Sequence, residues 1–274
     1  DWCPSRGLGD VYKRQGSRIV IGAPYNDGNG SNSGHVRVYD YDTTNGWTQV
    51  GNDIDGKSED SLTGFSVAMN DSGDTIVVGA PGYKKAPYTI STLTEYDNKI
   101  GLVRVYKHTL DDDDGSDLWT QLGEDITISD SVILHDYYKY HVSPNIYDKL
   151  ADNNFGFNYY FGYSVDINKS GNRIIIGAPY KVKESFSYWN DEKHGHAYVY
   201  YRKGSTWVKE DIDLSGNETT DIDMVTSSKK YKLEGNSYGT SVAINRNGKF
   251  IAVGAAIGLS LIHISEPTRL TSIS

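Results

Sequence analysis

A tyrosine-rich stretch, HDYYKYHVSPNIYDKLADNNFGFNYYF at residues 135–161, carries the strongest signal for recognition chemistry. Its six tyrosines lie among Asn and Asp: Tyr137, Tyr138, Tyr140, Tyr147, Tyr159 and Tyr160. Tyrosine offers a large contact area at low conformational cost together with a hydroxyl group, so such loops suit protein surfaces and sugars. These six side chains are therefore the candidate ligand-binding residues. The alternative is that the rings pack the loop onto the fold.

Signals for catalysis and for metal binding are weak. The sequence holds no nucleophile elbow, phosphate-binding glycine loop or paired-histidine zinc motif, so we predict no catalytic residue. His194 and His196 could form half of a metal site, but no third ligand lies within reach by sequence. Calcium needs six to eight oxygen ligands. The loop 27–31 offers one carboxylate, which favours a solvated turn, and the run 111–114 reads as a charged, edge-protecting turn. We expect no cofactor and no metal here, with calcium possible elsewhere in a full-length protein.

Composition narrows the class of partner. The chain of 274 residues has a formal net charge of −9, which argues against nucleic acid and against anionic membrane surfaces. No apolar run approaches the length of a membrane span. The only cysteine, Cys3, lies at one end, so a disulfide within the chain is not expected.

The two ends share no pattern with the interior. Residues 5–15 (SRGLGDVYKRQ) can be encoded by the reverse complement of DNA encoding residues 259–269 (LSLIHISEPTR). Both peptides resemble translated adapter sequence from a sequencing library, as expected of a metagenomic fragment. We therefore predict that segments 1–15 and 259–274 are adapter-derived and exclude them from the fold.

One pattern recurs through the interior. The segment TGFSVAMNDSGDTIVVGAP at 63–81 returns as FGYSVDINKSGNRIIIGAP at 161–179 and as YGTSVAINRNGKFIAVGAA at 238–256, and GSRIVIGAP at 16–24 is a truncated copy. Each copy predicts a strand, a tight turn and a second strand. Such repetition determines the architecture, because each unit has to stack on its neighbours.

Turn chemistry supports the predicted hairpins. A glycine of positive φ is expected to close each turn as a G1 bulge, at Gly73, Gly171 and Gly248. The asparagine that opens each turn is expected to accept a backbone N–H two residues on, at Asn70, Asn168 and Asn245. Proline lacks the N–H that a continuing ladder needs, so Pro24, Pro81 and Pro179 should end the second strand. The runs 19–21 and 174–176 are apolar at every position, which predicts strands covered on both faces.

Each hairpin is followed by two further strands. The third strand of each unit is expected at 35–39, 102–106 and 196–200, and the fourth at 47–51, 118–123 and 207–209. Four antiparallel strands in each unit predict an all-β fold, a partial β-propeller of about three to four blades. The expected propeller fragment spans 16–258, with blade parts at 16–56, 62–126, 161–213 and 236–258. Long inserts are expected at 82–99, 127–160 and 214–234, on one face of the repeat array.

Two motifs carry a family resemblance. Phe161-Gly162 and the Gly-Ala-Pro tripeptides at 22–24, 79–81 and 177–179 resemble FG-GAP repeats. Those repeats build the propeller at the head of integrin α chains and related propellers of secreted and surface proteins. The resemblance implies a β-propeller outside the cell. This sequence departs from the family at Thr63-Gly64, Tyr238-Gly239 and Ala256, and it lacks the family's Asp-x-Asp-x-Asp-Gly calcium loop.

The resemblance, the acidity and the loop composition predict a non-catalytic adhesion or recognition module of a secreted or surface protein, binding protein or carbohydrate. One alternative is the propeller scaffold of an extracellular enzyme whose active site lies in further parts of the protein. Another is a purely structural repeat. A carboxylate-lined pocket at the ring centre would favour an enzyme, and an aromatic rim would favour binding. We also expect a fragment of this kind to expose apolar blade faces at both ends and to self-associate.

Overall fold

The chain builds its regular structure from β-strands alone in every described part. The computed structural model describes residues 11–12, 17–84, 99–111, 113–128, 159–180, 195–212, 214, 237–255 and 263–265. These residues contain no helix, and thus no helix able to cross a membrane. The predicted all-β fold is confirmed.

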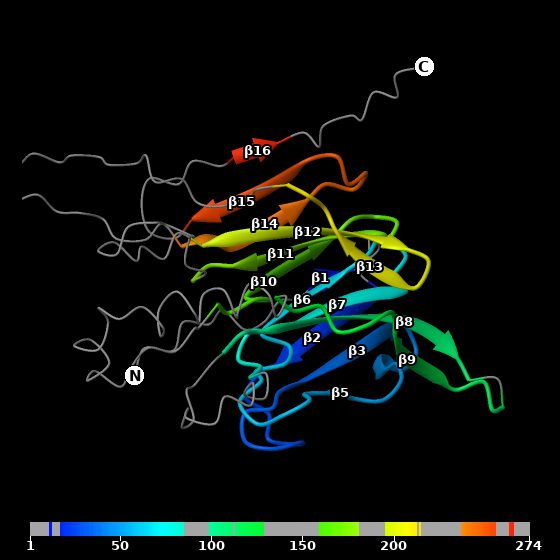
Figure 1. Ribbon diagram of the computed structural model, residues 1–274. Coiled ribbons are helices and arrows are strands. Elements are labelled where there is room, and N and C mark those ends of the chain that lie inside the picture. The colour runs from blue at the N-terminus through cyan, green and yellow to red at the C-terminus, as the bar shows by residue number, and fades with distance from the viewer. Residues whose placement is uncertain are drawn as a thin grey trace, which may run out of the picture.

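The strands form four antiparallel sheets that follow one another along the chain (Figure 1). The first sheet holds β1 (Val11–Tyr12), β2 (Arg18–Ala23), β3 (His35–Asp42), β4 (Gly46–Gln49) and β5 (Ile54–Asp55). The second holds β6 (Ser66–Met69), β7 (Thr75–Ala80), β8 (Leu102–Leu110) and β9 (Asp117–Gln121). The third holds β10 (Ser164–Ile167), β11 (Arg173–Ala178), β12 (His196–Lys203) and β13 (Thr206–Lys209). The fourth holds β14 (Tyr238–Ile244), β15 (Ile251–Ala255) and β16 (His263–Ser265).

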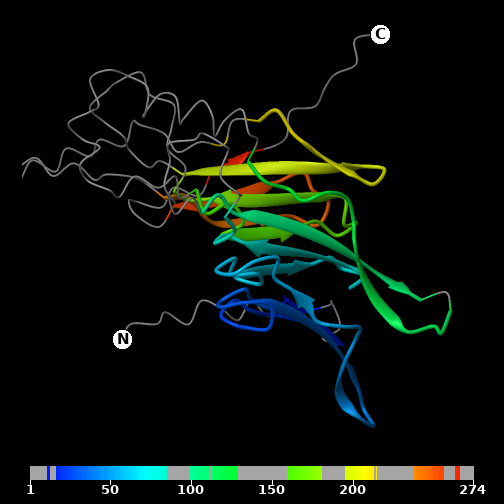
Figure 2. The ribbon, with the colours of Figure 1, turned by 60° about the horizontal axis from the view of Figure 1, so that its bottom comes forward.

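Each sheet is one blade of a partial β-propeller, as the repeats predict. Within a blade, consecutive strands are hydrogen-bonded neighbours in chain order, except that β5 of blade one pairs with β3 and not with β4. Figure 2 shows the blades stacked face to face, from blue at the N-terminal side to red at the C-terminal side. We number these blades one to four in chain order.

The hairpin turns have the predicted glycines, but their asparagines act differently. Gly73, Gly171 and Gly248 have φ values of 72°, 66° and 74°. The side-chain oxygen of Asn70 accepts the backbone N–H groups of Asp74 at 3.1 Å and Thr75 at 3.0 Å. The prediction of an acceptor two residues on was therefore wrong. The asparagine side chain instead accepts from the residues four and five positions on, where the second strand begins. The two later turns have the same hydrogen bonds.

The two repeated glycine motifs meet between blades. The second strand ends before the predicted proline in all three cases, at Ala23, Ala80 and Ala178. A Cβ atom on Gly79 would overlap the carbonyl oxygen of Gly162, which belongs to the next blade. The Gly22–Gly64 and Gly177–Gly239 pairs are arranged in the same way. The Phe-Gly motif of one repeat is therefore seated against the Gly-Ala-Pro motif of the repeat before it.

Tryptophan makes a second contact between neighbouring blades. The indole N–H of Trp119, on β9 of blade two, donates to the carbonyl oxygen of Val50 in blade one at 3.0 Å. Trp207, on β13 of blade three, donates to the carbonyl oxygen of Leu122 in blade two at 3.0 Å. Trp47 holds the same position in blade one, but it is 44% exposed and donates to no described residue.

Coverage of the second strand differs between inner and terminal blades. β7 is buried at all of its positions, and Ile174, Ile175 and Ile176 of β11 are each 0% exposed, as predicted. On β2, burial alternates, so Ile19 and Ile21 are only half-buried. The prediction for that run was wrong because one face of β2 packs against blade two, while no described blade covers the other.

Two short strands lie in the segments predicted to be adapter-derived. β1 pairs with β2 through Val11 and Val20, and β16 pairs with β15 through Ser265 and Ile251. The adapter origin of both segments stays a prediction, and in the structure residues 11–12 and 263–265 extend the first and fourth sheets. An unpaired strand edge offers a row of free N–H and C=O groups, and an extended segment of almost any sequence can satisfy them.

Candidate functional site

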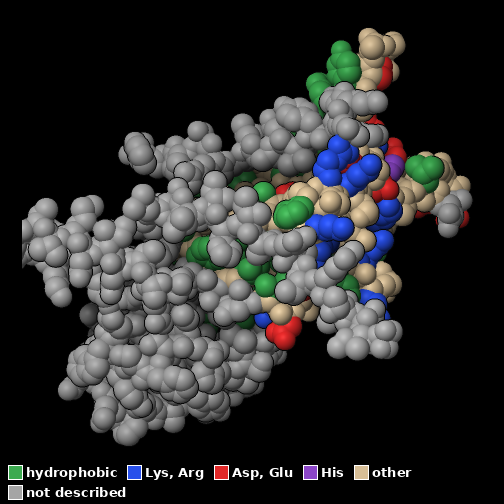
Figure 3. All heavy atoms as spheres, turned by 90° about the horizontal axis from the view of Figure 1, so that it is seen from above, with side chains coloured by type: hydrophobic (Ala, Val, Ile, Leu, Met, Phe, Trp, Pro, Cys, Tyr) green, Lys and Arg blue, Asp and Glu red, His purple; other side chains and the backbone are tan. Residues whose placement is uncertain are grey.

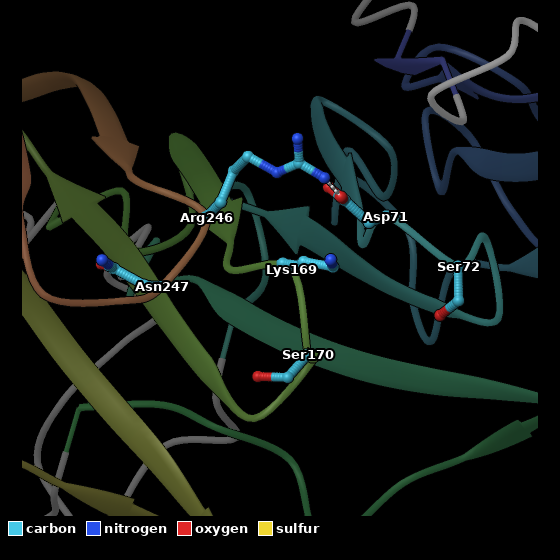
Figure 4. Close-up of a pocket in the computed structure, with 6 residues that line it drawn as sticks. All are labelled: Asp71, Ser72, Lys169, Ser170, Arg246 and Asn247. Atoms are coloured by element: carbon cyan, nitrogen blue, oxygen red, sulfur yellow. Dashed lines mark hydrogen bonds and ion pairs between the residues drawn. The ribbon is translucent and has the colours of Figure 1, made fainter.

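The first hairpin turns of three successive blades surround a pocket of about 630 Å³ (Figure 4). Each turn contributes its second and third residues to the wall: Asp71 and Ser72, Lys169 and Ser170, and Arg246 and Asn247. The repeat positions these six side chains, because the same asparagine-anchored turn is built at the same end of each blade. A backbone hydrogen bond of 3.0 Å from Lys169 N–H to the carbonyl of Arg246 joins two of the turns.

The pocket carries more positive than negative charge. Arg246 forms an ion pair with Asp71, which links blade four to blade two. In Figure 4 the Arg246 side chain reaches over to Asp71, and Lys169 extends between them. The Lys169 ammonium group makes no hydrogen bond or ion pair with a described residue, so one positive charge is left over. In a chain of net charge −9, this is a local reversal of sign.

The hydroxyl groups of the pocket serve the turns that carry them. Ser72 accepts a hydrogen bond of 2.9 Å from the Asn70 amide, and Ser170 donates at 2.8 Å to Asn172. Figure 3 shows Lys and Arg side chains gathered in one part of the surface seen from above. Lys169 and Arg246 outnumber the single carboxylate of Asp71, so the pocket has a net positive charge. Its lining holds one carboxylate, that of Asp71, and no aromatic side chain, so it matches neither the carboxylate-lined pocket nor the aromatic rim that the sequence left as alternatives.

A half-buried carboxyl group lies on the strand that leads into the pocket. Asp166, on β10, accepts the backbone N–H of Ile244 on β14 at 2.7 Å and that of Ile167 at 2.8 Å. Burial raises the pKa of Asp166, against the opposing effect of these two hydrogen bonds. Asp166 does not line the pocket itself, but a carboxyl group with a raised pKa close to it in the chain is a candidate for acid–base chemistry.

Sequence reasoning missed Asp166, although a signal was present. The other two complete copies of the repeat have alanine at this position, Ala68 and Ala243. The pocket was missed for a different reason. Asp71, Lys169 and Arg246 differ in charge from copy to copy, so each reads as an ordinary exposed turn residue until the blades are placed beside one another.

The predicted tyrosine site is only partly described. Tyr137, Tyr138, Tyr140 and Tyr147 lie outside the described residues, so their role stays a prediction. Tyr159 is 1% exposed and packs in the core beside Phe161, so burial makes its side chain part of the core and not of a binding surface. Tyr160 is half-buried, and its ring lies edge-on to Tyr180 with centroids 5.2 Å apart.

The remaining sequence candidates serve local structure where they are described. The Asp27 carboxylate accepts the backbone N–H of Asn32 at 2.8 Å within its own loop. Asp111 accepts the N–H of Asp113 at 2.8 Å in the turn between β8 and β9. His196 is half-buried on β12, and its ring lies 4.4 Å from that of Tyr198, while His194 falls outside the described residues.

Comparison with known proteins identifies no family. No family model and no curated protein matches the chain. Among solved structures, Sqt1 of Chaetomium thermophilum is similar with 11% identity and a TM-score of 0.43, over 91% of this chain and 43% of that one. The periplasmic gluconolactonase PpgL of Pseudomonas aeruginosa is similar with 11% identity and a TM-score of 0.39, over 90% of this chain and 49% of that one. The chain thus spans less than half the length of either structure.

These comparisons correct the expected function. One of the two similar structures is named as a gluconolactonase, which is an enzyme. The prediction of a non-catalytic adhesion or recognition module is therefore wrong. At this identity the likeness extends to the fold alone. The chain is similar to β-propellers, and what it binds has to be inferred from the residues of its own pocket.

Proposed function

We propose that this chain supplies blades to the scaffold of a propeller enzyme and that the turn pocket binds the anionic group of its substrate. The observation that carries the proposal is the unpaired ammonium group of Lys169 beside Arg246. Two cations against the single carboxylate of Asp71 leave a net positive charge in a cleft, which attracts anions and concentrates them there.

Asp166 supports the enzyme rather than a passive binding protein. Its carboxyl group is half-buried, has a raised pKa and lies on β10, three residues before Lys169 in the chain. A protonated carboxyl group can donate a proton to a reacting group, as a general acid does. The alternative is a purely structural repeat, in which Asp166 only ties β10 to β14 through the Ile244 N–H.

Anion binding is tested by titrating the full chain with inorganic phosphate and with malonate at low ionic strength, followed by calorimetry. We expect saturable binding that Lys169→Met weakens at least tenfold. Lys203→Met is the matched control, because Lys203 is an exposed lysine on the tip of the β12–β13 hairpin. Absence of saturable binding, or equal binding by the Lys169→Met variant, would overturn the proposal.

Catalysis is tested separately with chromogenic esters that carry a phosphate or a carboxylate group. We expect Asp166→Asn to abolish turnover while phosphate binding is kept. Binding without turnover of any anionic ester would leave the anion site standing and refute the enzyme. Turnover that is unchanged by Asp166→Asn would remove the role proposed for that carboxyl group.

We further infer a relation to FG-GAP propellers. The seating of Gly162 on Gly79, repeated at two other blade junctions, supports it, because it gives both motifs one shared structural task. An extracellular location would accord with that relation and stays a prediction. Detection of the chain in the secreted fraction of cells that express the whole gene would support it.

A further inference from the structure

A second group of polar side chains lies at the opposite end of blade one. β3 and β5 pair so that His35 faces Asp55 directly across the two strands. Facing residues of an antiparallel pair project from the same side of the sheet, and so does Asp53, two positions before Asp55. His35 lies where β3 begins, next to Ala23 at the end of β2, and this end is remote from the first hairpin turns.

The three side chains come close enough to share one ion. His35, Asp53 and Asp55 each offer a ligand atom, and all three atoms lie within 4.8 Å of one another. The Nδ1 atom of His35 is 3.7 Å from Oδ2 of Asp53, too far for a hydrogen bond. Two ligand atoms on a tetrahedral zinc ion are about 3.4 Å apart, given Zn–N and Zn–O distances near 2.1 Å. The separation therefore fits shared coordination better than direct bonding.

The hydrogen bonds around Asp53 leave the required lone pair free. Its Oδ1 accepts from the Arg37 Nε at 2.8 Å and from the Gln49 amide at 2.8 Å. Its Oδ2 accepts only from the Arg37 Nη2, at 2.6 Å. Oδ2 is also the oxygen that faces His35. A carboxylate fixed in this way matches the outer-shell support that metal-binding carboxylates have in proteins.

The other two ligands have no competing partner. His35 is 8% exposed, and its ring makes no hydrogen bond with a described residue beyond the ion-pair contact to Asp53. Among the described side chains only Ser58 Oγ is fully buried without a hydrogen-bond partner, so the His35 ring nitrogens stay open to solvent or to a ligand. The Asp55 carboxylate is exposed and free of described partners, and Arg104 of blade two holds its backbone carbonyl at 2.9 Å.

Comparison of the repeats separates the scaffold from the ligands. Blade two keeps the glutamine–aspartate contact, since Gln121 donates to Asp125 at 3.1 Å. The positions of His35 and Asp55 are occupied there by Leu102 and Thr127, which offer no comparable ligand pair. The aspartate of this motif is thus common to both blades, and blade one alone of the two surrounds it with two further metal-ligating side chains.

We propose that His35, Asp53 and Asp55 bind one divalent transition-metal ion, of which Zn²⁺ is the best match. A nitrogen ligand with two carboxylates suits borderline ions, whereas calcium would need at least three more oxygens. Three protein ligands leave a fourth position for water, the arrangement that catalytic zinc sites use. The site lies apart from the turn pocket, and the inference does not depend on the proposed enzyme.

The test is a calorimetric titration of the full chain with ZnCl₂ at pH 7.5, with Co²⁺ absorption as a report on coordination geometry. We expect one stoichiometric site, and Asp55→Asn should weaken it at least tenfold. That variant should fold normally, because the Asp55 side chain is exposed and has no described partner. His35→Gln should abolish the site, and its fold is checked by circular dichroism.

Two control variants separate this site from other histidines. His108→Gln removes a histidine paired with Asp117 at 2.7 Å, and His196→Gln removes one half of the pair noted in the sequence. Both should keep the zinc site. The proposal is overturned if no stoichiometric zinc is bound, if Asp55→Asn binds as tightly as the unmodified chain, or if His196→Gln is the change that abolishes binding.

Discussion

Trp119→Ala should destabilise the chain far more than Trp47→Ala, although the two residues hold the same place in adjacent repeats. The Trp119 indole is half-buried, donates to the Val50 carbonyl at 3.0 Å and packs against the core shared by blades one and two. Trp47 is 44% exposed, and its described ring contact is with Tyr41 of its own hairpin. The comparison therefore isolates the contact between blades.

The expected magnitudes follow from these contacts. Full burial of a tryptophan is worth about 3–5 kcal/mol on truncation to alanine, and Trp119 is half-buried. The lost hydrogen bond adds about 1 kcal/mol. We expect a loss of about 2–3 kcal/mol for Trp119→Ala, or a fall in Tm of about 5–10 °C for a domain of this size. Trp47→Ala should cost under about 1 kcal/mol.

Equilibrium urea unfolding followed by far-ultraviolet circular dichroism measures both variants without relying on tryptophan fluorescence. Trp119→Phe keeps most of the packing and removes the donor, so it should cost about 1 kcal/mol. Trp207→Ala should behave like Trp119→Ala, because Trp207 makes the same bond to Leu122. Equal losses for Trp47→Ala and Trp119→Ala would refute the reasoning, since the contact between blades would then contribute nothing.

Three further predictions concern packing and pH. Gly79→Ala should destabilise the chain strongly, because its Cβ would meet the Gly162 carbonyl of the next blade. Gly254→Ala should have a mild effect, because its Cβ would meet only a serine hydroxyl. Chemical denaturation compares the two variants. Burial opposes ionisation of Asp74, yet hydrogen bonds led by that from Lys107 hold the pKa of Asp74 far below its usual 3.8. The stabilisation is present above about pH 4 and is lost as the pH falls further. Asp74→Asn should therefore reduce the fall in stability that the unmodified chain shows below about pH 4. Burial raises the pKa of Tyr200 to about 12. Its contribution to the free energy of unfolding is therefore complete below about pH 10 and is lost as the pH rises through about 12. The stability of Tyr200→Phe should not change with pH in that range.

Each of these three can fail in a defined way. Equal losses at Gly79 and Gly254 would mean that the carbonyl of the next blade yields without cost. An unaltered acid limb in Asp74→Asn would show that other carboxylates dominate acid unfolding. An alkaline transition that persists in Tyr200→Phe would assign it to another group.

Repetition made the fold predictable from sequence. Three copies of one pattern, each with an asparagine, a glycine and a terminal apolar run, and a fourth truncated copy define strands, turns and blade order together. What single copies could not reveal is how they touch. The role of Gly79 depends on Gly162, which lies 83 positions further along the chain (162 − 79 = 83). The half-burial of Ile19 depends on which faces have a neighbouring blade, and local pattern carries no such information.

The candidate sites were less predictable, for physical reasons. The turn pocket joins residues from three repeats, and the charged position is Asp in one copy and Lys or Arg in the others, so no spacing rule points to it. The zinc candidate combines His35 with Asp53 and Asp55 through the pairing of β3 with β5. β5 has two residues, too few to give a periodic signal. The tyrosine-rich stretch was conspicuous by composition, but burial places Tyr159 in the core.

The pairing of Gly-Ala-Pro with Phe-Gly from the following copy has a consequence for the history of the gene. The three described blade junctions use the same pair of glycine contacts. A newly duplicated unit can therefore pack against the unit before it and the unit after it without further change. Shuffling or recombination among copies would preserve each interface, while the connecting loops remain free to diverge. Chimaeras that exchange whole units should therefore fold more readily than chimaeras cut within a unit.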